Sequence, residues 1–267
     1  MDLGLEGKVA LVTGGSRGIG AATALELARE GADTVLVGRD ADTAARTADA
    51  IRAETGRRSL PVAADLRDPN AAAGVVAAAV AQFGRLDILV NSAGATTHGD
   101  LFALTDENWQ DGFALKFHGT VRMCRAAWPH LAAAGGGAAG GGAVVTIIGV
   151  AARTPMPNAM IVGSVNSALL NFTKALADLG ARDGVRVNAI NPGFIETDRL
   201  KRRLDTAAQA QGITREEAAA AQLKTLGVSR FGQPEEIARL ACFLASPRAG
   251  YLQGAAVDAD GGLTKGV

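Results

Sequence analysis

The sequence predicts one α/β domain, a mostly parallel β-sheet with helices on both faces. Two observations lead to this fold class. Short β-branched runs alternate with longer alanine-rich runs along the 267 residues, and neither a linker nor a repeat divides the chain. A helix between two strands is the usual connection in a parallel sheet. We therefore expect a single domain over residues 1–267.

Seven apolar runs are expected to form strands, with a helix in most of the intervals between them. The third run is the weakest because it contains Pro61. A glycine- and alanine-rich segment, residues 132–142, is expected to be a flexible surface loop. The expected strands are 8–14, 33–39, 58–65, 85–94, 142–149, 184–193 and 254–262, and the expected helices are 19–32, 42–55, one after Pro69, a long one from near Thr105, and 166–180.

Composition and charge argue against several function classes. The formal net charge is +0 and no basic run is present, which disfavours a nucleic-acid partner. The N-terminus lacks the apolar core of a signal peptide, and no apolar run approaches the roughly 20 residues that span a bilayer. Cys124 and Cys242 have no metal-ligand spacing, so we expect no metal site. Buried cysteines in a reducing cytoplasm are the favoured interpretation.

A glycine-rich turn, TGGSRGIG at residues 13–20, joins the first predicted strand to the first helix. Gly14, Gly18 and Gly20 let the backbone turn tightly and approach a pyrophosphate. The helix that follows offers free N–H groups and the positive end of its dipole. This context, after a strand and before a helix, is the one that a dinucleotide-binding turn requires.

The turn resembles TGxxxGxG of the short-chain dehydrogenase/reductase superfamily, and further motifs follow in the order typical of that family. Asp65 and Leu66 resemble its adenine-contacting pair, NSAG at 91–94 resembles NNAG, and NPGFIET at 191–197 resembles the loop over the nicotinamide. GQPEEIARLACFLAS at 232–246 and DADGG at 258–262 are also similar. The resemblance covers nearly the whole chain.

The resemblance implies a three-layer Rossmann-type fold with a seven-stranded sheet, a nicotinamide cofactor and a small-molecule substrate. It also implies a homodimer or homotetramer in the cytoplasm, with no membrane partner. The residues that it implies for cofactor binding are Gly14, Ser16, Arg17, Gly18, Ile19, Gly20, Arg39, Asp65, Leu66, Asn91, Ala93, Gly94, Asn166, Pro192, Gly193, Ile195 and Thr197.

The end of the second strand indicates which nicotinamide cofactor is bound. Arg39 falls where a 2′-phosphate would lie, and Arg17 in the glycine turn can reach the same group. A guanidinium matches phosphate oxygens with two parallel hydrogen bonds. Asp40 is the competing observation, because an acid here serves the ribose hydroxyl of NAD. We favour NADP(H) over NAD(H).

The catalytic residues of the family are not found at their aligned positions. The resemblance places Gly149 at the family's serine, Val162 at its tyrosine, Asn166 at its lysine and Lys116 at its asparagine. The chain contains one tyrosine, Tyr251, near the C-terminus and far in sequence from the cofactor motifs. The usual phenol is therefore not available as the proton donor.

Lysine and asparagine have exchanged places between two helices, which suggests a substitute for the phenol. If the helices are neighbours, the ammonium of Lys116 enters the same pocket, and Asn166 binds the ribose hydroxyls. Burial lowers the pKa of a lysine from its ordinary value near 10.4. We therefore predict Lys116 and Asn166 as the catalytic pair. The alternative is a lysine that extends to solvent.

Other candidates are weaker. His98, in the loop after NSAG, is a candidate acid, although a surface histidine is the favoured interpretation. Ser164 is expected to be a helix cap. Residues 198–203 after the nicotinamide loop are strongly charged; contact with an acidic substrate is the alternative to a solvated helix face.

Three functions are compatible with the sequence. The first is an NAD(P)(H)-dependent oxidoreductase that acts on a carbonyl/alcohol pair through Lys116. The second is a lyase or isomerase on the same fold, since fold does not dictate chemistry. The third is a catalytically silent NADP-binding protein. The substrate is not identified by any motif.

Overall fold

Seven parallel strands form one sheet in the order β3-β2-β1-β4-β5-β6-β7, as the sequence predicted. The computed structural model describes residues 2–134 and 141–266. Pro61 lies in β3, an edge strand, where its missing N–H is tolerated. The strands are β1 (Val9–Thr13), β2 (Asp33–Gly38), β3 (Ser59–Ala63), β4 (Ile88–Asn91), β5 (Ala143–Ile147), β6 (Arg186–Pro192) and β7 (Ala256–Ala259).

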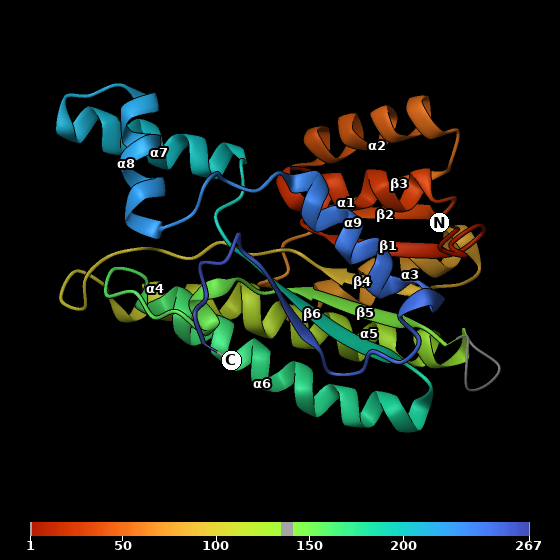
Figure 1. Cartoon of the computed structure of the whole chain (residues 1–267). Coiled ribbons are helices and arrows are strands. Elements are labelled where there is room, and N and C mark those ends of the chain that lie inside the picture. The colour runs from red at the N-terminus through yellow and green to blue at the C-terminus, as the bar shows by residue number, and fades with distance from the viewer. Residues whose placement is uncertain (1, 135–140, 267) are drawn as a thin grey trace.

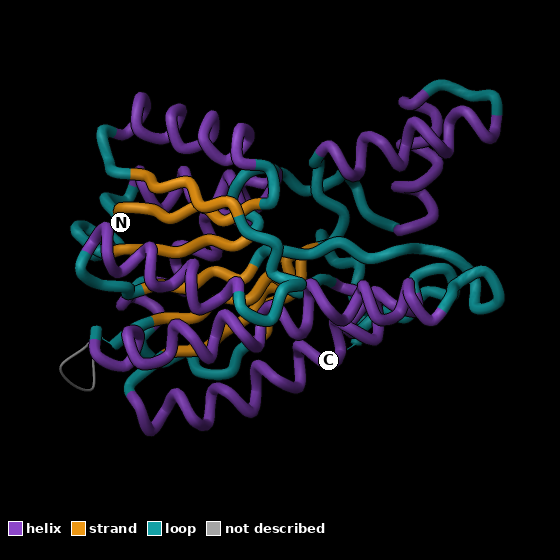
Figure 2. The backbone as a smooth tube through the Cα atoms, turned by 180° about the vertical axis from the view of Figure 1, so that it is seen from behind, coloured by secondary structure: helices purple, strands orange, loops and turns teal. Residues whose placement is uncertain are grey.

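Helices cover both faces of the sheet, which completes the three-layer Rossmann-type arrangement (Figures 1 and 2). On one face α1 (Gly18–Arg29), α2 (Ala41–Thr55) and α9 (Pro234–Ala245) bury apolar side chains against the strands. On the other face α3 (Ala71–Phe83), α5 (Gly119–Ala133) and α6 (Met160–Asp183) do the same. Both faces of the central strands are therefore buried, in keeping with their continuous apolar sequences.

The long helix expected from Thr105 is present but is not uniform. Thr105 caps α4 (Asp106–Gly112) by accepting a hydrogen bond from the N–H of Asn108, and a π-helical stretch, η1 (Phe113–His118), then joins α4 to α5. α6 begins at Met160 instead of residue 166, since Ile161 and Val165 pack into a buried cluster with Ile148. Ser164 therefore lies one turn inside α6, and the cap expected there is wrong.

Two helices stand away from the sheet beyond the carboxyl end of β6, as Figure 1 shows at upper left. They are α7 (Asp198–Gln211) and α8 (Arg215–Leu226), and they share a small apolar core built around Leu200, Leu204 and Phe231. The sequence analysis assigned no helix to this segment. Of the loop expected at 132–142, residues 132 and 133 end α5, and 135–140 lie outside the described residues.

The parallel topology brings distant motifs to one edge of the sheet. The carboxyl ends of all seven strands point the same way, so the segments that follow β1, β2, β4, β5 and β6 meet there. The order of connection reverses between β1 and β4, which is the position where open α/β sheets bind ligands. The site is therefore sought at this edge.

Candidate active site

The glycine turn between β1 and α1 has the geometry that a diphosphate requires. Gly14 has φ of +65°, and a Cβ there would lie 3.0 Å from the backbone of Ala93, so a side chain is excluded. Arg17 precedes the first turn of α1 and makes no side-chain cap, which leaves the N–H groups of that turn free of a capping side chain. Backbone N–H groups and the helix dipole therefore face the turn, and an anionic dinucleotide fits here.

Basic side chains gather at the end of β2, beside the glycine turn. Arg17 Nη2 and Arg46 Nη2 each donate to Thr43 Oγ1 at 2.9 Å. Arg39 is exposed at the end of the strand. Asp40 caps α2 by accepting from Thr43 N at 2.7 Å, and this bond with the Thr43 hydroxyl lowers the pKa of the carboxyl. Arg46 was not found by sequence reasoning, because it comes near Arg17 only through Thr43 on α2.

The segments after β3 and β4 are held in place by side chains within the sheet. Thr13 Oγ1 accepts hydrogen bonds from Ser92 N at 3.0 Å and from Ala93 N at 3.1 Å, which ties the NSAG segment to β1. Leu66 is buried, and the neighbouring Asp65 accepts a hydrogen bond from the backbone at residue 67. Thr13 was missed as a positioning residue, although it is the first residue of the quoted glycine motif.

The loop after β6 lies against the glycine turn. A Cβ at Gly18 would lie 3.3 Å from Thr197 Cγ2, so the Thr197 methyl covers that glycine. Ile195 pairs with Gly232 in an isolated parallel bridge, which fixes the loop after Pro192 and Gly193. The structure thus brings this predicted cofactor loop and the glycine turn together.

Lys116 and Asn166 meet beyond the end of β5. Lys116 Nζ donates to Asn166 Oδ1 at 2.6 Å and to the Ile148 carbonyl oxygen at 2.5 Å. Asn166 is 1% exposed, and its Nδ2 donates to the Gly149 carbonyl at 3.4 Å. The hypothesis that the ammonium enters this pocket agrees with the structure, whereas a lysine extended to solvent does not. The predicted contact of Asn166 with a ribose stays a prediction.

The π-helical stretch explains how Lys116 reaches this position. A π-turn inserts one extra residue into a helix and changes the direction of the side chains that follow it. Lys116 lies in the middle of η1, and its aliphatic stem packs on Gly94, where a Cβ would be 3.0 Å from Lys116 Cδ. The stem is thus enclosed by the NSAG segment, and the ammonium is directed at β5.

Burial in this pocket lowers the pKa of Lys116 to about 7, and the nearby charge of Arg199 adds to the shift. An ammonium has three N–H donors, and two of them are directed at Asn166 Oδ1 and the Ile148 carbonyl. The remaining tetrahedral position carries a proton when the amine is charged and a lone pair when it is neutral. The group can therefore donate or accept a proton near neutral pH, always in the same direction.

The backbone at Gly149 is unsuited to a side chain. Its φ is +126°, and a Cβ built there would lie 3.0 Å from Asn166 Nδ2. Val162 is partly buried on the first turn of α6. Tyr251 is fully exposed and precedes β7, so it lies at the amino edge of the sheet, opposite the site. The position of Tyr251 excludes it as a proton donor to this site.

Comparison with known proteins agrees with this geometry. The family profile described as Enoyl-(Acyl carrier protein) reductase matches residues 14–264. The chain belongs to the short-chain dehydrogenase/reductase superfamily. It is 37% identical over 254 residues to short-chain reductase protein NovJ of Streptomyces niveus, covering 95% of this chain and 93% of NovJ.

Other members of the superfamily support the same class of chemistry. The 3-oxoacyl-[acyl-carrier-protein] reductase FabG of Vibrio cholerae is 34% identical over 261 residues, 98% of this chain and 99% of FabG. The crystal structure of L-sorbose reductase from Gluconobacter frateurii, complexed with NADPH and L-sorbose, matches 100% of both chains with a TM-score of 0.95 and 35% identity. These relatives are oxidoreductases, and they place this chain among enzymes of that class.

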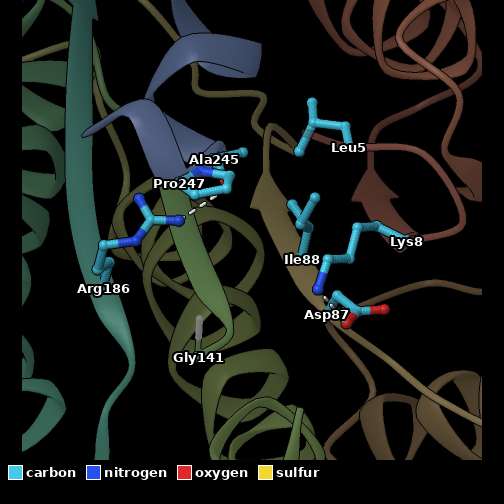
Figure 3. A pocket seen from close by; sticks show the side chains of 8 residues that line it. All are labelled: Leu5, Lys8, Asp87, Ile88, Gly141, Arg186, Ala245 and Pro247. Atoms are coloured by element: carbon cyan, nitrogen blue, oxygen red, sulfur yellow. Dashed lines mark hydrogen bonds and ion pairs between the residues drawn. The ribbon is translucent and has the colours of Figure 1, made fainter. Parts of the chain in front are cut away.

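The opposite edge of the sheet holds a small pocket whose polar groups are already paired (Figure 3). Asp87 pairs with Lys8 at 3.5 Å and with Arg85 at 2.6 Å, and Arg186 donates to the carbonyls of Leu244 and Ala245. In residues 2–134 and 141–266 there is no cluster of metal-ligating side chains, and no helix is both long and apolar enough to cross a membrane. We therefore place the candidate active site at the carboxyl edge.

Proposed function

We propose that the protein is an NADP(H)-dependent oxidoreductase of the short-chain type that interconverts a carbonyl and an alcohol, with Lys116 in place of the superfamily's tyrosine. The observation that carries the proposal is the position of Lys116 Nζ, 2.6 Å from Asn166 Oδ1 and 2.5 Å from the Ile148 carbonyl, with a pKa of about 7. Gly149, Val162 and Asn166 stand at the other aligned catalytic positions, so the usual serine, tyrosine and lysine are absent.

The chain's own groups supply the proton and its orientation. In reduction, the carbonyl oxygen of the substrate takes a proton from the Lys116 ammonium as the carbonyl carbon gains a hydride, and the neutral amine is then reprotonated by solvent. Asn166 and the Ile148 carbonyl hold the amine in one direction throughout. The nicotinamide, when bound, supplies or accepts the hydride. A positioned acid of this kind contributes about 10²–10⁴-fold to the rate.

The choice of NADP(H) is supported by the charges beside the glycine turn. Arg17 and Arg46 converge on Thr43, and Arg39 lies at the end of β2, so three guanidinium groups surround the position of a 2′-phosphate. Asp40, the competing acid, is engaged in capping α2. The complexes of L-sorbose reductase with NADPH add support from a related chain.

Two measurements test the proposal. Calorimetric titration with NADPH and NADH measures binding, and we expect tighter binding of NADPH. Absorbance of the reduced nicotinamide measures turnover with a panel of ketoses, 3-oxo esters and keto acids. Lys116→Met should abolish turnover and leave NADPH affinity unchanged. Lys174→Met, which removes an exposed lysine of α6, is the matched control and should behave as the wild type.

Two results would contradict the proposal. Turnover by Lys116→Met at the wild-type rate would exclude Lys116 as the proton donor. Tight NADPH binding without turnover of any member of the panel would favour the catalytically silent protein instead.

A further inference from the structure

Basic side chains of α7 lie next to Lys116 in the candidate active site. Arg199 Nη2 donates to the Gly94 carbonyl at 2.5 Å, and Gly94 is also the residue on which the stem of Lys116 packs. The charge of Arg199 contributes to the lowered pKa of Lys116. Arg199 and Lys116 are therefore close neighbours on either side of one glycine.

Two further cations extend this group away from Lys116. Arg203 lies one helical turn after Arg199, so the two side chains share a face of α7. The guanidinium of Arg203 lies 5.6 Å from the ring centroid of Phe194, which restricts its position. His98, in the loop after β4, has a pKa lowered first by burial and then by the charge of Arg203, with Arg199 adding a smaller effect.

This cation group, Lys116, Arg199, Arg203 and His98, has no acidic partner within the described residues. Burial lowers the pKa of Arg199 and of Arg203, which shows that water solvates these charges incompletely. Elsewhere the chain pairs its arginines, as Arg230 with Glu236 at 2.7 Å. Bringing unpaired cations together costs free energy, and a bound anion offsets that cost.

We infer that the substrate carries an oxyanion, a carboxylate or a phosphate, that Arg199 and Arg203 bind while its carbonyl faces Lys116. A guanidinium donates two parallel hydrogen bonds to either oxyanion, and Arg199 and Arg203 share one face of α7. His98 adds a third donor at the outer end of the group. This inference rests on the proposed function and adds the class of substrate to it.

The diphosphate of the cofactor is the competing occupant of these cations. Thr197, at the start of α7, already lies against Gly18 of the glycine turn. Arg203 comes six residues later and lies beside Phe194 and His98, away from that turn. Arg203 is therefore the residue that distinguishes the two occupants, because a substrate role leaves NADPH affinity unchanged and a diphosphate role does not.

The test compares acids with their neutral counterparts as substrates. The first pair is 3-oxobutanoate and its methyl ester, and the second is dihydroxyacetone phosphate and dihydroxyacetone. We expect the wild type to prefer one acid over its neutral partner in kcat/KM, and the pair identifies which oxyanion is used. Arg203→Gln should reduce this preference roughly 10- to 100-fold with unchanged NADPH affinity. Lys201→Gln, the control, removes a charge from a different face of α7 and should retain the preference.

A binding measurement separates this inference from the proposed redox function. The same four compounds are added to the protein loaded with NADP⁺, and the shift in melting temperature is recorded, so that no turnover is needed. Preferential binding of an acid that Arg203→Gln abolishes supports the inference even if no compound is reduced, in which case only the proposed function fails. Equal treatment of acids and neutral partners by the wild type, or a parallel loss of NADPH affinity in Arg203→Gln, overturns the inference and leaves the proposed function standing.

Discussion

Basic side chains gather at two places on the same edge of the sheet, and their surroundings differ. Beside β2, Arg17 is 62% exposed and faces Asp40, itself 57% exposed, at 3.9 Å. Beside β5, Lys116 is enclosed by Gly94, Ile148 and Asn166, and burial brings its pKa to about 7. A solvated guanidinium suits the binding of a phosphate, whereas a desolvated amine can exchange a proton. The same kind of charge is thus directed to two functions by its solvation.

Replacing Lys116 by arginine should break the comparison most severely. A guanidinium keeps the positive charge but does not release its proton at any pH that the protein tolerates. We expect Lys116→Arg to lose about 10²–10⁴-fold in kcat, with NADPH affinity unchanged in calorimetric titration. If Lys116→Arg retained most of the turnover, the charge of Lys116 would matter and its proton would not.

The exposed end of the comparison is tested at Arg17. A charge-assisted hydrogen bond to phosphate contributes about 1.5–3 kcal/mol, so Arg17→Gln should weaken NADPH binding roughly 10- to 100-fold. NADH, which lacks the 2′-phosphate, should bind the variant as it binds the wild type. Arg125→Gln, which removes an exposed arginine of α5, is the control. Equal losses for NADH and NADPH would argue against a 2′-phosphate contact.

The pH dependence of turnover sharpens the role of desolvation. Reduction needs the protonated form of Lys116, whose pKa is about 7. The kcat/KM for reduction should therefore fall as pH rises through about 7, approaching a tenfold loss per unit, while alcohol oxidation rises over the same range. Steady-state rates from about pH 5.5 to pH 9 measure both limbs. A profile that stays flat across neutrality would assign the proton to another group.

The smallest expected effect is on stability. The pKa of Lys116 is lowered from 10.5 to about 7 in the folded chain, so the unfolded chain binds more protons between these values. The free energy of unfolding therefore rises with pH in that window. Relative to Lys116→Met, the wild type should gain roughly 1 kcal/mol or more between about pH 7 and pH 9.5. Urea unfolding of both proteins, with Lys174→Met as control, measures the change; a constant difference would mean that Lys116 is not desolvated.

Much of the fold followed from local patterns. The seven strands, the glycine turn and the cap at Thr105 were predicted because each depends on a few adjacent residues. The early start of α6, the separate pair α7 and α8, and the π-helical stretch around Lys116 were not predicted. Each depends on packing against segments that are distant in sequence, such as Ile161 against Ile148.

The candidate site was predicted less completely. Arg46 was missed because its partner in the site, Arg17, comes near it only when α2 packs beside the glycine turn. Thr13 was missed because its hydroxyl acts on a segment that begins 79 residues later. The exchange of Lys116 and Asn166 was visible in the sequence, but not that the two side chains touch.

The sequence alone determined the alternation of strands and helices, the turn that backbone N–H groups offer to a diphosphate, and the replacement of the usual proton donor. These properties are local, since they depend on backbone conformation and on which residue types are present. Only the tertiary structure decided that Lys116 is a desolvated amine and that Arg199 and Arg203 lie beside it without acidic partners. Solvation is set by all the atoms around a charge, and here those atoms come from β4, β5, α6 and α7.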